Sequence, residues 1–211
     1  MGRMDWCTNS GWNDEIEARF FQKLKRARDK VQPLRAQAAS LVETHPTVAL
    51  ALLRLYFEAG DDGQRADAYA IQADAYKVLG DVNLTIAALE CAVAEERRRP
   101  FVKTQAHIEI PFLVASLGLR ERYPRALQLL AESKDEMIFP IQHFKWHVAS
   151  ALILAAMNDV SAARGHALSA LHYAASTDSG FRRHRSLGLV GPTHDELRAQ
   201  LLELVGEVGR A

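Results

Sequence analysis

ADAYAIQADAYKVLGDVNLTIAALECAVAEERRRP, residues 66–100, contains two helix-forming segments of similar length with one break between them. The break is Leu79-Gly80-Asp81-Val82, in which glycine can end the first helix and aspartate can cap the second. Small residues such as Ala73 and Ala92 allow two helices to approach closely. The stretch therefore predicts an antiparallel helical hairpin.

Similar breaks recur along the chain. Gly80-Asp81, Gly118 and Asn158-Asp159 lie about 40 residues apart, and each follows a segment rich in small and aromatic residues. A period of this length is typical of stacked helical hairpins. Pro111 lies inside one of these segments and is expected to bend its helix. The sequence thus predicts an all-α array of about four antiparallel hairpins, at about 13–60, 64–98, 101–136 and 140–175.

The N-terminal part departs from this pattern. Residues 1–12 are polar, contain Trp6 and Trp12 and lack a helical period, so we expect a flexible arm unless the tryptophans dock. After Asn13, which can cap a helix, one apolar stripe continues in phase across Pro33. The continuous phase favours a single helix kinked at Pro33, with a helix break there as the alternative. The stripe consists of Ile16, Phe20, Leu24, Ala27, Val31, Leu34, Ala38 and Leu41.

The C-terminal part departs from it as well. Residues 176–192 are long for a connection in a compact helical domain. Thr193 and Glu196 then predict a capping box at the start of a short amphipathic helix over 193–209. Such a helix is suited to cover the end of an array. With this helix included, residues 13–211 are predicted to form a single domain.

The composition is that of a soluble globular protein. The 211 residues are 48% hydrophobic, and 26 lysines and arginines balance 26 acidic residues. Zero net charge argues against broad electrostatic attraction to nucleic acid or acidic membranes. Neither a signal-peptide pattern nor an apolar run of membrane-spanning length is present in the sequence. A cytoplasmic protein without membrane or nucleic-acid partners is therefore expected.

Cys7 and Cys91 are the only cysteines. One lies in the polar N-terminal segment and the other among alanines of a predicted helix, so no disulfide framework is implied. Reduced thiols fit a cytoplasmic location. We expect Cys91 to be a core residue rather than a nucleophile.

Taken together, these positions give the chain a resemblance to the tetratricopeptide repeat (TPR) family. The clearest copy matches the aromatic, small and turn positions of that family at Tyr69, Ala73, Tyr76, Gly80-Asp81, Ile86, Leu89 and Ala92. The fourth hairpin matches at Ala151, Leu154, Asp159, Ala163, Ala167 and Ala170. The chain is also similar to uncharacterised bacterial TPR-like proteins that share its WNDEIEARFF start and its SGF and GLV segments. The resemblance implies a right-handed superhelix in a bacterial cytoplasm, closed by the C-terminal helix.

A repeat array of this kind would present the first helix of each hairpin on its concave face. Residues three or four apart share one face of a helix. Here they combine mixed charges with an apolar floor, which suits an extended peptide. The alternative is that some of them only pack inside a closed superhelix. The predicted concave-face residues are Asp67, Asp74, Lys77, Gln105, Glu109, Phe112 and Lys145.

The long connection carries the densest basic cluster beside an aromatic residue. Arginines in a glycine-bounded loop can bind phosphate or carboxylate through paired hydrogen bonds. The alternative is a solvated loop that packs Phe181 and Leu187 on the last hairpin. The predicted loop residues are Phe181, Arg182, Arg183, His184 and Arg185.

Two histidines have the spacing of paired metal ligands. His143 and His147 are four residues apart and can face the same side of a helix. No glutamate lies between them and no third ligand is fixed by spacing, so they are weak candidates, and neither a metal nor a cofactor is predicted. The basic residues of the first helix are interpreted as its solvent-exposed face; they are Lys23, Lys25, Arg26, Arg28 and Lys30.

These patterns predict a non-enzymatic scaffold that binds a protein or peptide on the concave face of a helical-repeat array. One alternative is a sensor in which the concave face and residues 181–185 hold a small anionic ligand or peptide. A second alternative is a homo-oligomeric assembly module that uses the stripe from Ile16 to Leu41.

Overall fold

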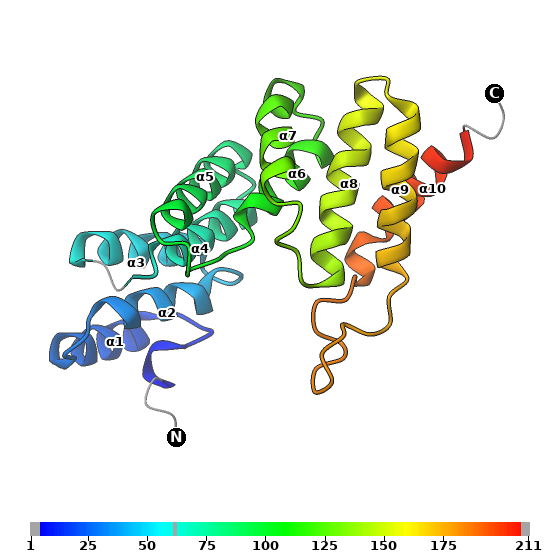
Figure 1. Cartoon of the computed structure of the whole chain (residues 1–211). Coiled ribbons are helices and arrows are strands. Elements are labelled where there is room, and N and C mark those ends of the chain that lie inside the picture. The colour runs from blue at the N-terminus through cyan, green and yellow to red at the C-terminus, as the bar shows by residue number, and fades with distance from the viewer. Residues whose placement is uncertain (1–4, 61–62, 208–211) are drawn as a thin grey trace. The chain divides into compact units, whose positions relative to one another are not determined.

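The structure is a computed structural model that describes residues 5–60 and 63–207. Over these residues it is all-α, as predicted, with ten α-helices and no strand (Figure 1). None of the described helices is both long enough and apolar enough to cross a membrane. The chain is described below as two compact units, Met1–Ala106 and His107–Ala211.

Unit 1 contains the helices of the N-terminal half. Consecutive helices pack against one another in chain order, from α2 (Val31–Leu41) through α3 (Pro46–Ala59) and α4 (Arg65–Val78) to α5 (Val82–Arg98). The segment over 66–100 forms the α4–α5 pair, in which Gly80 takes a left-handed backbone (φ +77°) and the Asp81 side chain accepts a hydrogen bond from Leu84 N at 2.9 Å. The elements are η1 (Asp5–Cys7), α1 (Asp14–Arg26), α2 (Val31–Leu41), α3 (Pro46–Ala59), α4 (Arg65–Val78) and α5 (Val82–Arg98).

The expected kinked helix across Pro33 is wrong, because α1 ends at Arg26 and a new helix begins at Val31. The Asp29 carboxylate accepts hydrogen bonds from the backbone N–H of Val31 at 2.9 Å and Gln32 at 3.2 Å. Pro33 therefore lies in the first turn of α2, where a missing N–H costs no helical hydrogen bond. The stripe kept its phase because both helices face the same core.

Residues 5–12 pack against helices α1 and α2 of the same unit. The rings of Trp6 and Trp12 each lie 5.6 Å from the ring of Phe20, and Cys7 is fully buried. The buried Gln37 side chain accepts a hydrogen bond from Asn9 N at 3.1 Å and donates one to Asn9 O at 2.8 Å. The docking of the tryptophans, which the sequence left open, therefore makes this segment part of the core.

The core of unit 1 continues from α1 to α4. Its members include Phe20, Leu24, Leu34, Leu41, Leu53, Tyr56 and Ile71. On its border the ring of Tyr69 in α4 stacks on Phe57 of α3 at 4.6 Å, with the Arg65 guanidinium 5.1 Å from the Phe57 ring. Cys91 is exposed on α5, so the expectation of a core cysteine there is wrong. Its neighbours Ala88 and Ala92 take the buried positions instead.

Unit 2 is built around the α8–α9 pair, against which α7 and α10 pack. Asp159 caps α9 by accepting a hydrogen bond from Ala162 N at 3.1 Å. Pro111 lies inside α6 and is buried. The elements are α6 (Ala106–Ser116), η2 (Arg120–Arg122), α7 (Tyr123–Glu132), α8 (Pro140–Ala156), α9 (Val160–Ala174), η3 (Pro192–His194) and α10 (Asp195–Glu207).

The last helix packs on α9, with its buried Leu201 in one cluster with Phe144 of α8. It begins at Asp195, two residues later than predicted, because Thr193 belongs to the preceding short turn η3. The Arg198 guanidinium donates to the backbone oxygens of Ala174 at 3.2 Å and Val190 at 2.9 Å. This arginine thus joins α10 to the end of α9 and to the loop before η3.

Candidate functional site

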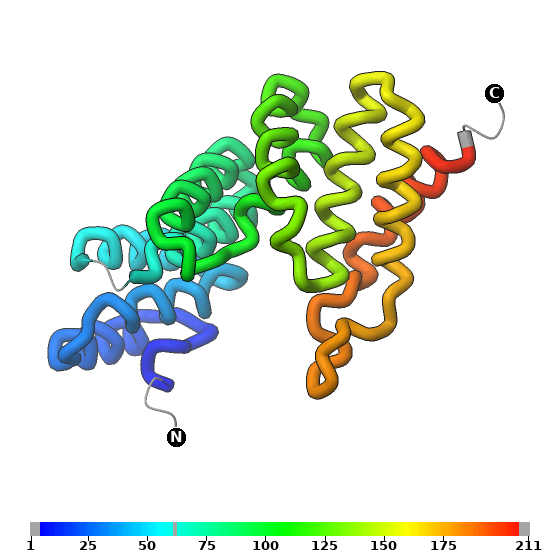
Figure 2. The backbone as a smooth tube through the Cα atoms, viewed as in Figure 1, coloured from blue at the N-terminus to red at the C-terminus, as the bar shows by residue number. Residues whose placement is uncertain are grey.

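The loop 176–192 of unit 2 has a defined internal structure. Figure 2 shows it, in orange, folding back on itself beyond the ends of α8 and α9. The largely buried Ser179 joins its two sides, since its N–H donates to Arg185 O and its hydroxyl donates to His184 O, both at 2.8 Å. Gly180 takes a left-handed backbone (φ +81°) at the turn that follows.

The loop is also attached to the start of α8. Ile141 N donates to Gly188 O at 2.8 Å, and the Phe139 ring lies against Gly188. The contact is so close that a Cβ built on Gly188 would lie 2.6 Å from Phe139 Cβ. The ring of Phe181 lies 5.2 Å from that of Phe139. Phe181 therefore packs back on the last hairpin, as the alternative interpretation expected, yet it stays partly exposed.

Exposed arginines and apolar side chains lie together on this loop and its anchor. Arg182 and Arg183 are exposed and make no ion pair with any residue in the described part of the chain, whereas Arg185 Nε lies 3.6 Å from Asp178. Ile138, Phe181 and Leu187 are 63%, 41% and 51% exposed. We call these residues the loop surface; it consists of Ile138, Phe181, Arg182, Arg183, Arg185 and Leu187.

The predicted concave-face residues of unit 1 lie on α4 and just before α6. Asp67 makes an ion pair with Arg35 of α2, which neutralises its charge. Asp74 and Lys77 are exposed further along α4. Gln105 is exposed just before α6 begins at Ala106 and is therefore outside the helix on which we expected it.

In unit 2 the structure brings the other three predicted residues together. Lys145 of α8 makes an ion pair with Glu109 of α6, and its ammonium lies 5.2 Å from the centre of the Phe112 ring. The His194 ring lies on the other side of this group, 5.9 Å from Phe112 and 5.4 Å from Phe144. The ion pair occupies the charges of Lys145 and Glu109 within the fold, so this cluster is interpreted as packing between α6, α8 and η3.

The structure pairs His147 with His166 rather than with His143, its predicted partner. His147 Nδ1 lies 3.0 Å from His166 Nδ1 of α9, whereas the His143 ring stacks on Tyr173 at 4.4 Å. Burial, with His166 and His143 nearby, lowers the pKa of His147 to about 4. Burial also lowers the pKa values of His143 and His166. No cluster of three metal-ligating side chains occurs among the residues that the structure describes.

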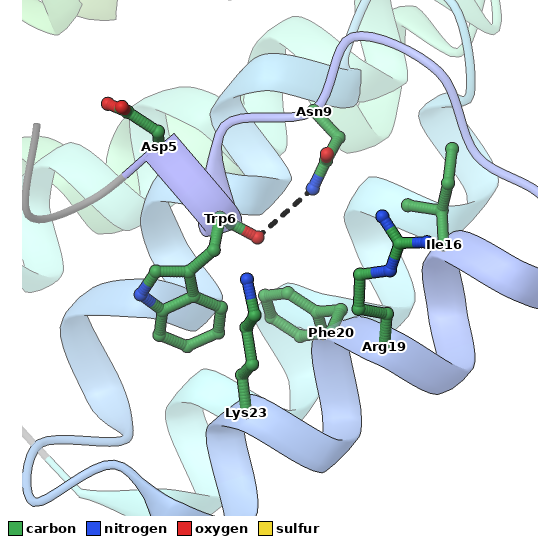
Figure 3. Close-up of a pocket in the computed structure, with 7 residues that line it drawn as sticks. All are labelled: Asp5, Trp6, Asn9, Ile16, Arg19, Phe20 and Lys23. Atoms are coloured by element: carbon green, nitrogen blue, oxygen red, sulfur yellow. Dashed lines mark hydrogen bonds between the residues drawn. The ribbon is translucent and has the colours of Figure 1, made fainter. Parts of the chain in front are cut away.

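The N-terminal segment forms a pocket that the sequence did not indicate. Its volume is about 370 Å³, and the residues around it come from η1, the following segment and α1 (Figure 3). Sequence reasoning missed it because residues 1–12 were interpreted as an arm and Lys23 as part of a solvent-exposed face. The signal that could have indicated it is the pair Trp6 and Trp12, whose docking the sequence left open. The lining residues are Asp5, Trp6, Asn9, Ile16, Arg19, Phe20 and Lys23.

The two cysteine thiols have raised pKa values. Burial raises the pKa of the Cys7 thiol, and partial desolvation together with the nearby Glu95 and Glu90 carboxylates raises that of the exposed Cys91; both shifts are opposite to the one that activates a nucleophilic cysteine. The chain matches no protein-family model, no curated protein and no solved structure. The TPR-like superhelix therefore stays a prediction, and function has to be inferred from the surfaces themselves.

Proposed function

We propose that this protein is a non-enzymatic binding protein whose loop surface captures an acidic, partly apolar peptide segment of another protein. The observation that carries the proposal is the pair Arg182 and Arg183, exposed without ion pairs to the described residues beside three exposed apolar side chains. Guanidinium groups form paired hydrogen bonds with carboxylates, and apolar neighbours add desolvated area to the contact.

Local charge favours an acidic partner. Residues 176–192 contain three arginines and one aspartate, which gives a local net charge of +2 in a chain whose overall net charge is zero. Arginines that have no internal partner gain more from an external carboxylate than arginines already paired inside the fold. The positive charge also increases the rate of encounter with an acidic segment at low salt.

The internal structure of the loop favours binding as well. Hydrogen bonds of Ser179, and the bond from Ile141 N to Gly188 O, hold the loop, so the backbone that carries its arginines is restricted in position. A surface that is already ordered loses less conformational entropy when it binds. A solvated loop of the same composition without such contacts would lose that advantage.

Assembly through the Ile16–Leu41 stripe is not proposed. Phe20, Leu24, Leu34, Ala38 and Leu41 are buried within unit 1, so they have no surface left to offer to a second copy. A small anionic ligand at residues 181–185 remains the second candidate, because the same guanidinium groups can bind phosphate or carboxylate.

Removing the two unpaired arginines is expected to weaken peptide capture. The probe is a short fluorescein-labelled peptide that alternates glutamate and leucine, followed by fluorescence anisotropy at low salt. Arg182→Ala with Arg183→Ala should raise its Kd about tenfold or more, because each lost charge-assisted contact costs on the order of 1 kcal/mol.

The control is Arg26→Ala with Arg28→Ala, which removes the same charge from exposed positions in unit 1. This variant should bind the peptide like the wild type, and the melting temperatures of all three proteins should agree. Equal weakening in both double variants, or equal binding of a lysine–leucine peptide, would contradict the proposal. If the glutamate–leucine peptide does not bind but inorganic phosphate does, the result favours the small-anion candidate.

A further inference from the structure

We infer that the pocket between η1 and α1 in unit 1 is a binding site for a small aromatic carboxylate. This site is separate from the loop surface and does not depend on the proposed function. The inference rests on an aromatic floor, two cationic side chains on one helix face, and a wall that the fold holds in place.

The floor of the pocket is aromatic. Phe20 is buried beneath it, and the Trp6 ring lies 5.6 Å from the Phe20 ring at an interplanar angle of 38°. Figure 3 shows the Trp6 and Phe20 rings on either side of the Lys23 side chain, and all three residues line the pocket. Because Phe20 is 1% exposed, it closes the floor from below, and the half-buried Trp6 ring is the aromatic surface on which a planar ligand can stack.

Two cations rise from α1 on either side of Phe20. Arg19 and Lys23 are four residues apart and therefore share one helix face. Figure 3 shows the Lys23 ammonium directed toward the segment of Trp6 and Asn9, whereas the Arg19 guanidinium extends along α1 beside Ile16. Arg19 Nη2 donates to Glu15 at 2.7 Å, outside the lining, whereas Lys23 has no ion pair with any described residue. Lys23 is therefore the cation that is available to an anionic group.

The Asp5 carboxylate of the lining points away from the pocket and therefore does not repel a bound anion (Figure 3). Asp5 is the acidic residue of the lining, and Figure 3 shows its carboxylate turned outward, away from the Phe20 ring. The Asn9 amide donates to Trp6 O at 3.1 Å and to the Gln37 side chain at 2.8 Å. The orientation of the Asn9 amide is thus fixed by the fold. With Asp5 turned outward, Lys23 is the principal charge that faces the pocket.

The segment around Asn9, which lies opposite α1, is held in place by hydrogen bonds to α2. Asn9 and Gln37 share three hydrogen bonds of 2.8 to 3.1 Å, and Gln37 is fully buried in α2. A buried side chain that satisfies a backbone N–H and a backbone C=O at once fixes the path of the segment. The pocket is therefore formed before a ligand arrives, which lowers the entropic cost of binding.

The volume limits the size of the ligand. About 370 Å³ is at the lower end of small-molecule sites and equals the liquid volume of roughly a dozen water molecules. One or two fused rings with a carboxylate fit this space. Charge, planarity and volume together specify a mono- or bicyclic aromatic carboxylate.

The probe for the test is indole-3-carboxylate, with its neutral amide as the matched control. The chain contains three tryptophans, Trp6, Trp12 and Trp146, so a ¹⁵N–¹H spectrum of the full chain resolves three indole N–H signals. Each signal is assigned from a Trp→Phe variant. We expect the carboxylate to shift the Trp6 signal in a saturable way and to leave Trp146 unchanged.

Two variants of α1 separate a site from general attraction. Lys23→Gln removes the cation that faces the pocket, and Lys25→Gln removes an exposed cation outside the lining. Lys23→Gln should weaken binding at least about fivefold, and Lys25→Gln should leave it unchanged. Equal effects of both variants, equal binding of the amide, an equal Trp6 shift with acetate, or no Trp6 shift would each overturn the inference.

Discussion

Replacing Gly188 by alanine is expected to lower the free energy of unfolding of unit 2 by about 2–4 kcal/mol. Two costs add at this position. The backbone of Gly188 is left-handed (φ +69°), and the new Cβ would lie 2.6–2.7 Å from the Cβ and ring atoms of Phe139. Because Phe139 also contacts Phe181, its displacement should separate the loop 176–192 from α8. Urea denaturation followed by circular dichroism measures the loss.

Two other glycines of unit 2 provide matched controls. Gly180 has the same left-handed backbone (φ +81°) but open space around an added Cβ, so Gly180→Ala isolates the backbone cost of about 1–2 kcal/mol. Gly165 lies in α9 with open space, so Gly165→Ala should raise stability by up to about 1 kcal/mol. If Gly188→Ala proves no more harmful than Gly180→Ala, the loop does not pack on Phe139 as described.

Acid is expected to destabilise unit 2 through the contact between His147 and His166. The pKa of His147 is lowered from 6.5 to about 4 in the folded protein, so the unfolded chain binds a proton first as the pH falls. This contribution to stability is complete above pH 6.5 and is lost between pH 6.5 and 4. Integration between pH 7.5 and 5 gives a loss of about 2 kcal/mol.

The geometry gives the reason for this loss. Two Nδ1 atoms 3.0 Å apart hold one hydrogen between them, and a proton on both rings places two N–H donors against each other. The Trp146 ring packs against both histidines, 5.0 Å from His147 and 5.4 Å from His166, and limits their hydration. Neighbouring His143 on α8 adds repulsion when it is charged.

Chemical denaturation at pH 7.5 and 5.0 tests this prediction against His147→Gln, which retains a hydrogen-bonding side chain without a titrating ring. The variant should lose about 2 kcal/mol less than the wild type over this pH range, since the other ionisable groups are common to both proteins. Identical pH dependence of the two proteins would show that the pair is protonated without penalty.

Local signals in the sequence were sufficient for most of the helices and for the turns at Gly80-Asp81 and Asn158-Asp159. Glycine and aspartate at residues 80–81, and Asn158-Asp159, marked the turns because left-handed backbone and a capping carboxylate are properties of those residues themselves. Pro33 was misinterpreted for a complementary reason. Two helices that face one core keep their apolar residues in phase, so periodicity does not distinguish a kink from a break.

The sequence identified candidate residues by their chemistry, but it did not identify the residues that they contact. Sequence identified Lys145 and His147 as chemically notable, yet only packing shows that Lys145 is paired with Glu109 and that His147 faces His166 rather than His143. The pocket in unit 1 required the N-terminal segment to fold back on Phe20. A contact between Asn9 and Gln37, 28 residues apart, leaves no periodic signature.

By itself, the sequence determined an all-α chain, the positions of its turns and the positive charge of the loop 176–192. These follow from propensity, capping and composition, which act over a few residues. The tertiary structure alone decided that Arg182 and Arg183 lack ion pairs with the described residues, that Gly188 must remain without a side chain, and that Lys23 faces a pocket. Each of these depends on contacts between segments that are distant in the sequence, and burial and long-range packing determine those contacts.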